Sequence, residues 1–151
     1  MKTWFAPILA FSCLMFHASG FAGPSENEKG TPEAPNNAKS VVGDYYRGDG
    51  TGYNIYLTLK ENGDYSAKWR GCLGEYGTAS GKWSLNDKTI ALSPTKEERM
   101  MQGHLKNLHV LKFHGNWILV PYNDRDFYDK HGVSRYSCFQ KSDEKKIDSK
   151  N

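Results

Sequence analysis

Cysteine is scarce in this sequence, and long apolar runs are lacking after its first residues. Only 3 of the 151 residues are cysteine, and one of them, Cys13, lies inside the N-terminal apolar stretch. No later stretch is apolar over the roughly 18 residues that a transmembrane helix requires, so we expect no membrane span beyond that point. The formal net charge of +3 is too small to indicate nucleic acid as a partner.

Motifs that would indicate catalysis or metal binding are also lacking. The segment 48–52 is rich in glycine, but a strand pattern follows it where a phosphate-binding loop needs a helix. The spacing of His104, His109 and His114 suits neither a helix face nor a turn around one metal ion. We therefore predict no catalytic residue, no metal ligand and no cofactor.

The N-terminus carries the pattern of a secretory leader. Lys2 precedes an apolar run from Trp4 to Phe16, and small residues follow as far as Ala22. This pattern predicts a signal peptide over residues 1–22. The mature protein is therefore expected to be periplasmic or secreted.

The two cysteines that follow the leader are Cys72 and Cys138. In an oxidising compartment, two cysteines in a small domain most simply pair with each other, so we predict a Cys72–Cys138 disulfide. Closing so long a loop would contribute roughly 4 kcal/mol to stability. Two free thiols and an intermolecular bridge are the alternatives.

Composition divides the rest of the chain into three parts. Residues 23–40 are rich in glycine, proline and polar side chains without an apolar period, which predicts a disordered spacer. Residues 142–151 mix charges of both signs and are predicted to form a flexible tail. Residues 41–141 remain as one folded domain with a modest core.

Alternation of apolar and polar residues predicts antiparallel strands within this domain. Residues 53–59 and 65–69 alternate on either side of a turn in which Gly63 takes a positive φ. Two more hairpins are predicted over 81–92 and 108–120. Both parities are apolar in the last hairpin, so we expect its strands to be covered on both faces.

Serial hairpins indicate an all-β fold, an antiparallel up-and-down meander that forms a small barrel or half-barrel. Side chains of one parity, among them Trp69 and Trp83, are expected to form the core. One short helix is predicted to begin at Ser93, with Pro94 in its first turn, and to end at Gly103.

Two short motifs carry a resemblance to a known family. Gly43-Asp44-Tyr45 opens the first predicted strand, and Gly81-Lys82-Trp83 precedes a tight turn and an apolar strand. In these motifs and in its serial hairpins the chain resembles the lipocalin-like small β-barrels of the bacterial envelope. The resemblance implies that a Gly-x-aromatic step places a ring across the base of the barrel. It also implies a binding, inhibitory or structural role, because these are the roles of the family's members.

A candidate binding patch lies on the polar parity of the first hairpin, where Tyr56, Lys68 and Arg70 fall together. A tyrosine beside cations on an exposed sheet face is typical of a protein contact or of a site for an anionic ligand. The alternative is a solvated sheet face on which a cation lies over a ring.

These observations favour a secreted, monomeric, non-enzymatic protein that binds a small ligand or an envelope or secreted protein, with inhibition as one such role. A small hydrolase that uses the carboxylates near Asp124 is the first alternative, and a structural envelope protein is the second. A barrel pocket would have an apolar lining of inward aromatic residues, whereas a hydrolase would have a cleft in which two carboxylates converge.

Overall fold

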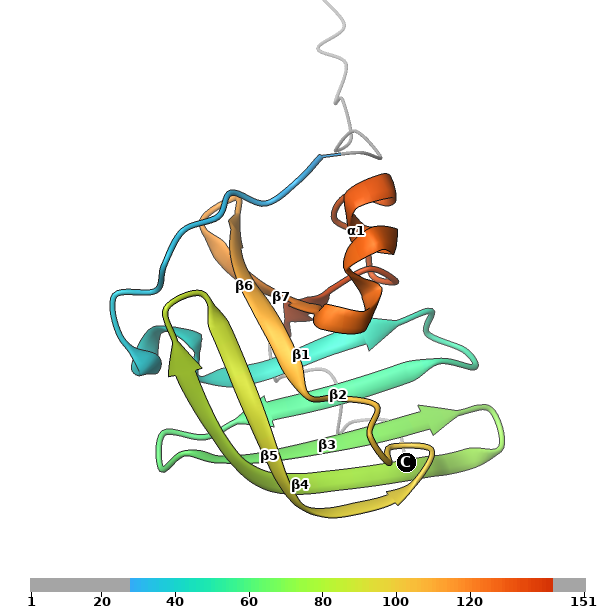
Figure 1. The fold of residues 1–151 in the computed structure, drawn as a ribbon. Helices are drawn as coiled ribbons and strands as arrows, with labels where there is room; N and C mark the ends of the chain where they lie inside the picture. Colours follow the sequence, from blue (N-terminus) through green and yellow to red (C-terminus); the bar gives the residue numbers. More distant parts are fainter. Residues whose placement is uncertain (1–27, 143–151) are drawn as a thin grey trace, which may run out of the picture.

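The computed structural model of the chain describes residues 28–142 and shows an all-β fold (Figure 1). The predicted signal peptide, residues 1–22, lies outside the described residues, as does the predicted tail apart from Ser142.

Eight antiparallel strands follow one another around a closed barrel in chain order. The short strand β8 closes it by pairing with both β1 and β7. Closure pairs the first strand of the meander with the last, whereas β5 pairs with β6 only over residues 89–91. The predicted antiparallel meander barrel is confirmed. The strands are β1 (Gly43–Gly48), β2 (Asn54–Leu59), β3 (Asp64–Gly71), β4 (Gly74–Asn86), β5 (Thr89–Arg99), β6 (Asn107–Phe113), β7 (Asn116–Pro121) and β8 (Phe139–Lys141).

The predicted alternation places one side-chain parity inside the barrel. Leu57, Ala67 and Ala79 lie opposite one another on β2, β3 and β4, and all three are buried. Trp83 is also buried, and Trp69 packs against the same core while remaining partly exposed. The turn between β2 and β3 has the positive φ predicted at its glycine, +78°.

Both rings of the Gly-x-aromatic motifs belong to this core, and Tyr45 contacts the short 3-10 helix η1 (Ala38–Val41). The Tyr45 hydroxyl donates to the Val41 carbonyl at 2.7 Å, and the Trp83 indole N–H donates to the Lys60 carbonyl at 2.9 Å. Each ring therefore buries its apolar body, and its polar atom still forms a hydrogen bond. Without such a partner, the buried polar atom would remain unpaired.

A second apolar cluster lies outside the barrel, between β6–β7 and the helix α1 (Arg125–His131). Leu111 and Ile118 from the sheet pack there with Tyr128 and Cys138. The prediction that the third hairpin is covered on both faces is therefore confirmed, because β6 and β7 contribute to both clusters.

Part of the segment predicted to be a disordered spacer instead lies along the barrel. Thr31 forms a β-bridge with Lys112, and the Gly30 N–H donates to the Tyr128 hydroxyl at 2.7 Å. Backbone pairing and one buried tyrosine hold residues that have no apolar period of their own. Composition alone does not reveal such contacts.

The helix is not where the sequence signals placed it. Residues 93–99 continue β5, which pairs with β4 along its length apart from Thr95. Thr95 is an extra residue beside Pro94, at a shift in register opposite Gly81. A bulge tolerates a proline because the missing N–H breaks no regular ladder bond. The observed helix is α1, which follows the 3-10 turn η2 (Tyr122–Asp124).

The predicted Cys72–Cys138 disulfide is wrong, because both cysteines are free thiols. Cys72 is exposed in the turn that joins β3 to β4, whereas Cys138 is fully buried in the cluster beneath α1. The Cys138 thiol donates to the Ser134 carbonyl at 3.4 Å, and burial raises its pKa. The pairing was inferred from cysteine number and compartment, which do not encode this spatial separation.

None of the helices within residues 28–142 has the length and apolar character needed to cross a membrane.

Candidate functional site

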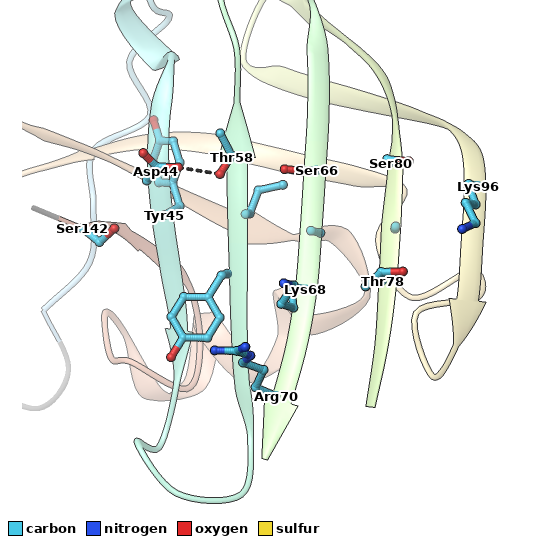
Figure 2. Close-up of a pocket in the computed structure, with 14 residues that line it drawn as sticks. Asp44, Tyr45, Thr58, Ser66, Lys68, Arg70, Thr78, Ser80, Lys96 and Ser142 are labelled. Carbon is cyan, nitrogen blue, oxygen red and sulfur yellow. Dashed lines mark hydrogen bonds between the residues drawn. The ribbon is translucent and has the colours of Figure 1, made fainter. Parts of the chain in front are cut away.

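A polar groove of about 950 Å³ runs across the outer face of β1–β5 (Figure 2). Its size is within the roughly 300–1,000 Å³ of small-molecule sites. Its walls come from side chains that point away from the barrel core, and its floor includes the edges of core residues. The lining side chains that bear hydrogen-bonding groups are Asp44, Tyr45, Tyr56, Thr58, Ser66, Lys68, Arg70, Thr78, Ser80, Lys96 and Ser142.

All three residues of the predicted binding patch line this groove. Tyr56 on β2 lies directly opposite Lys68 on β3, and Arg70 follows Lys68 by two residues on the same face. The structure thus places Tyr56, Lys68 and Arg70 together on one wall. That they bind a ligand stays a prediction.

The cations of the groove differ in how far their charge is already neutralised. Lys96 lies 2.9 Å from the Glu98 carboxylate, whose hydrogen bond raises the pKa of the lysine. Lys68 lies at a looser 3.6 Å from Glu75. Arg70 has no ion-pair partner within residues 28–142, and it is exposed. An arginine keeps its charge at any physiological pH and offers five donors, so Arg70 is the cation of the groove with the most unengaged donors.

Hydroxyl groups lie between the cations. Thr58 donates to Asp44, and Thr78 donates to Glu98 at 2.8 Å. The hydroxyls of Ser66 and Ser80, which lie opposite each other on β3 and β4, have no hydrogen-bond partner among the described side chains and backbone. A hydroxyl both donates and accepts, so these two suit the oxygen atoms of a ligand.

The half of the groove formed by β4 and β5 was not predicted from the sequence. Thr78 and Ser80 flank Ala79, whose inward position fixes their outward direction. Extending the alternation of β3 into the next strand would have found them. Lys96 was hidden because Ser93 and Pro94 resemble the start of a helix.

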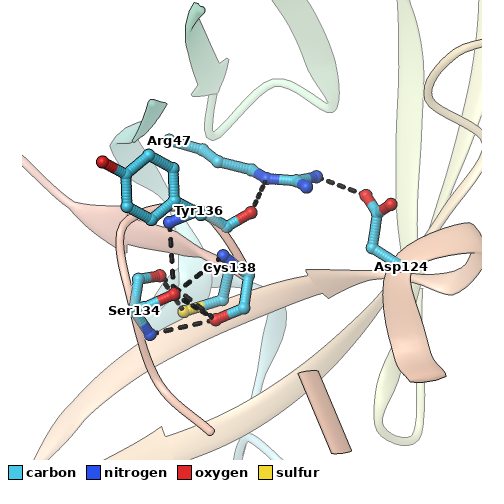
Figure 3. A network of polar contacts seen from close by, with 6 residues as sticks. Arg47, Asp124, Ser134, Tyr136 and Cys138 are labelled. Carbon is cyan, nitrogen blue, oxygen red and sulfur yellow. Dashed lines mark hydrogen bonds and ion pairs between the residues drawn. The ribbon is translucent and has the colours of Figure 1, made fainter. Parts of the chain in front are cut away.

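An ion pair between a buried arginine and a partly exposed aspartate fastens the long connection between β7 and β8 to the barrel (Figure 3). Arg47 on β1 is only 5% exposed, and its guanidinium pairs with the Asp124 carboxylate. The Arg47 Nε–H also donates to the Tyr136 carbonyl at 2.8 Å, and the guanidinium lies 5.6 Å from the Tyr53 ring centre. The contacts position this connection, because Arg47 bonds residues at both of its ends.

These contacts bear on the carboxylates proposed for a hydrolase. Asp124 faces Arg47, and Asp129 accepts a hydrogen bond from Arg125 at 2.9 Å. Each carboxylate therefore has a cationic partner rather than a second carboxylate as its neighbour. No cluster of three or more His, Cys, Asp or Glu side chains that could hold a metal ion occurs in residues 28–142.

Two of the histidines, His104 and His109, pack on aromatic rings. His104 lies 4.9 Å from Trp69, and His109 stacks on Tyr122 at 4.2 Å. Burial lowers the pKa of His104, and the positive charge of Arg47 lowers it further. Burial is also the main cause that lowers the pKa of His109.

No family model, curated protein or solved structure matches this chain. The closed eight-stranded barrel is consistent with a lipocalin-like architecture.

Proposed function

We propose that this protein is a non-enzymatic binding protein of the lipocalin-like kind, exported from the cytoplasm, whose outer groove binds a small acidic ligand. The leader pattern supports export, and the closed barrel supports the family resemblance. Binding is assigned to the outer groove, because its lining is rich in cations and hydroxyls.

The exposed, unpaired guanidinium of Arg70 is the observation that carries the proposal. An exposed cation within a groove attracts an anionic group without first giving up an internal partner. A carboxylate or phosphate also matches the forked geometry of arginine. Lys68 and Tyr56 on the same wall add a second charge and a phenol hydroxyl.

The spacing of the cations indicates a ligand longer than a single acid group. Lys68 lies on β3 and Lys96 on β5, so two strand spacings, about 10 Å, separate their backbones. The Ser66 and Ser80 hydroxyls, on β3 and β4, lie in one cross-strand row with Lys96. The groove therefore fits an oligosaccharide or comparable polyol that carries several acid groups.

A calorimetric titration with trigalacturonate tests this function. We expect Arg70→Gln to weaken binding at least about tenfold, because a charge-assisted hydrogen bond contributes about 1.5–3 kcal/mol. The matched control is Arg135→Gln, which removes an exposed arginine from the β7–β8 connection. It should leave the affinity unchanged.

The fully methyl-esterified trisaccharide provides a ligand of nearly the same shape without charge, and it should bind far more weakly. Equal affinities for the acid and its ester, or equal effects of the two arginine substitutions, would contradict the proposal. So would a lack of measurable binding by the unaltered protein.

A further inference from the structure

One row of polar side chains crosses the outer groove from β1 to β5, with a carboxylate at one end and an ammonium at the other. Strand register takes one member of the row from each strand, and Figure 2 shows the members side by side along the sheet. All of them line the groove. In order from β1, the row consists of Asp44, Thr58, Ser66, Ser80 and Lys96.

The Asp44 carboxylate at the β1 end keeps capacity for a ligand. Its Oδ1 atom accepts from the Thr58 hydroxyl, and no other donor in residues 28–142 reaches this side chain. It also forms no ion pair with any cation of that range, Lys141 on the neighbouring strand β8 included. A negative charge therefore remains open at one end of a groove that is otherwise lined by cations and hydroxyls.

The hydrogen-bonding capacity of the row changes along its length. Thr58 donates its only proton to Asp44, so towards a ligand both side chains can only accept. Ser66 and Ser80 have free hydroxyls, which both donate and accept, and Lys96 can only donate. The β1–β2 end thus requires a donor group on the ligand, whereas the β3–β5 end suits acceptors.

The charges of the groove follow the same division. Its lining cations, Lys68, Arg70 and Lys96, all lie on β3 and β5, and the lining residues of β1 and β2 include none. Asp44 lies two strand spacings, about 10 Å, from Lys68. Tyr56 is the diagonal cross-strand neighbour of Asp44, and aromatic rings attract ammonium groups. An acid group at the β1 end would be repelled, and a positively charged donor would be attracted.

We propose that the ligand of the groove is bipolar, an acidic oligosaccharide that carries a protonated amino group at one end. Its ammonium donates to the free Asp44 Oδ2 atom and to the Thr58 oxygen, while its acid groups lie against Lys68 and Arg70. This inference rests on the proposed function of the groove and adds to it the direction in which the ligand lies. Asp44 is then the residue that selects an amino end over a neutral or acidic one.

Two derivatives of trigalacturonate isolate the amino group. Reductive amination with ammonia converts the reducing end to a 1-amino-1-deoxy alditol, and borohydride reduction gives the corresponding alditol. The two products differ only in an ammonium against a hydroxyl at that end. In calorimetric titrations at neutral pH, we expect the amino derivative to bind the unaltered protein about five- to tenfold more tightly, as for a partly buried charge-assisted hydrogen bond.

Asp44→Asn should abolish this preference, because an amide has no charge to attract the ammonium. The substitution keeps an oxygen that accepts from Thr58, so the fold of β1 and β2 should be preserved. It should not weaken binding of the alditol or of trigalacturonate. Asp87→Asn is the matched control, because Asp87 is an exposed carboxylate in the turn between β4 and β5 without an ion pair in residues 28–142. It should leave the preference intact.

Arg70→Gln should weaken both derivatives by the same factor, since it acts at the other end of the ligand. Equal affinities of the amino derivative and the alditol for the unaltered protein would overturn the inference, as would equal preferences in Asp44→Asn and Asp87→Asn. If trigalacturonate binds through Arg70 while the amino group brings no gain, the inference alone fails. If none of the three sugars binds, the proposed function of the groove fails with it.

Discussion

The inner and outer faces of strands β1–β5 come from the same alternating sequence, yet they have opposite chemistry. The inner residues Ile55 and Leu57 on β2 are fully buried, whereas their neighbours Tyr56 and Thr58 line the outer groove. On β3 the inner Ala67 lies between Ser66 and Lys68, both of which are exposed. One period-two pattern thus supplies the core with one parity and the proposed binding surface with the other.

This comparison predicts that changes on the two faces have separable effects. An inner-face substitution should reduce the free energy of unfolding and leave the groove intact in molecules that remain folded. An outer-face substitution should change affinity with little effect on stability. Substitutions on each face and in the contacts that join the β7–β8 connection to the barrel test this separation.

Trp83→Ala should lower the free energy of unfolding by about 3–5 kcal/mol, because it removes a large core side chain and the indole hydrogen bond to Lys60. Urea denaturation measures the effect. Its outer-face control is Lys82→Ala, the preceding residue on β4, whose ammonium is exposed. That change should stay within about 1 kcal/mol, as for other exposed ion pairs. Equal losses in the two variants would refute the division into faces.

Asp124→Asn should destabilise the protein by roughly 2 kcal/mol, because it leaves the buried Arg47 guanidinium without its counter-charge. Loss of one partner from a fully buried pair costs about 3–5 kcal/mol, and partial exposure of Asp124 reduces this cost. Asp126→Asn on the exposed side of α1 is the control. If both variants have the stability of the unaltered protein in urea, Arg47 and Asp124 do not hold the β7–β8 connection.

His104 should make the protein less stable in mild acid. Its folded pKa lies below the ordinary value, so the unfolded chain binds a proton more readily as pH falls below about 6.5. The stability contributed by the neutral, buried imidazole is complete above that pH and decreases until the folded pKa is reached. His104→Gln should flatten the dependence of the urea midpoint on pH over this window, whereas exposed His114→Gln should not. Parallel curves for the His104 variant and the unaltered protein would contradict this role.

The smallest effect on stability is expected for the double substitution Ser66→Ala with Ser80→Ala on the outer face. The free energy of unfolding should change by less than about 0.5 kcal/mol, as at most surface positions. The affinity for trigalacturonate should fall about thirtyfold, because each of the two lost hydrogen bonds contributes on the order of 1 kcal/mol. Calorimetry and urea denaturation on the same preparation measure both quantities. A loss of stability without a loss of affinity would reverse the expected pattern.

The alternation of apolar and polar residues made the barrel predictable from the sequence, because apolar residues such as Leu57 and Ala67 have polar residues on both sides in the chain. It also brought together Tyr56, Lys68 and Arg70, which lie on two adjacent strands joined by a short turn. Lys96 could not be found in this way, because Ser93 and Pro94 are local helix signals that pairing with β4 overrides.

Contacts between segments far apart in sequence could not be predicted either. Asp124 ends η2 and meets Arg47 on β1 only after the barrel closes. The helix α1 lacks a side-chain cap at Asp124, so its start carries no clear sequence signal. The disulfide prediction failed for a related reason. The number of cysteines does not show that Cys72 lies in an exposed turn and Cys138 in a buried cluster.

An NMR titration of the ¹⁵N-labelled protein with trigalacturonate tests the central claim most directly. Ligand contact with the outer groove predicts that backbone amide signals of Tyr56, Ser66, Lys68, Arg70 and Ser80 shift together, with one common affinity. The signals of α1, on the β6–β7 side, should stay in place. Shifts confined to α1, or an unchanged spectrum at saturating trisaccharide, would contradict the assignment of ligand binding to the outer face of the barrel.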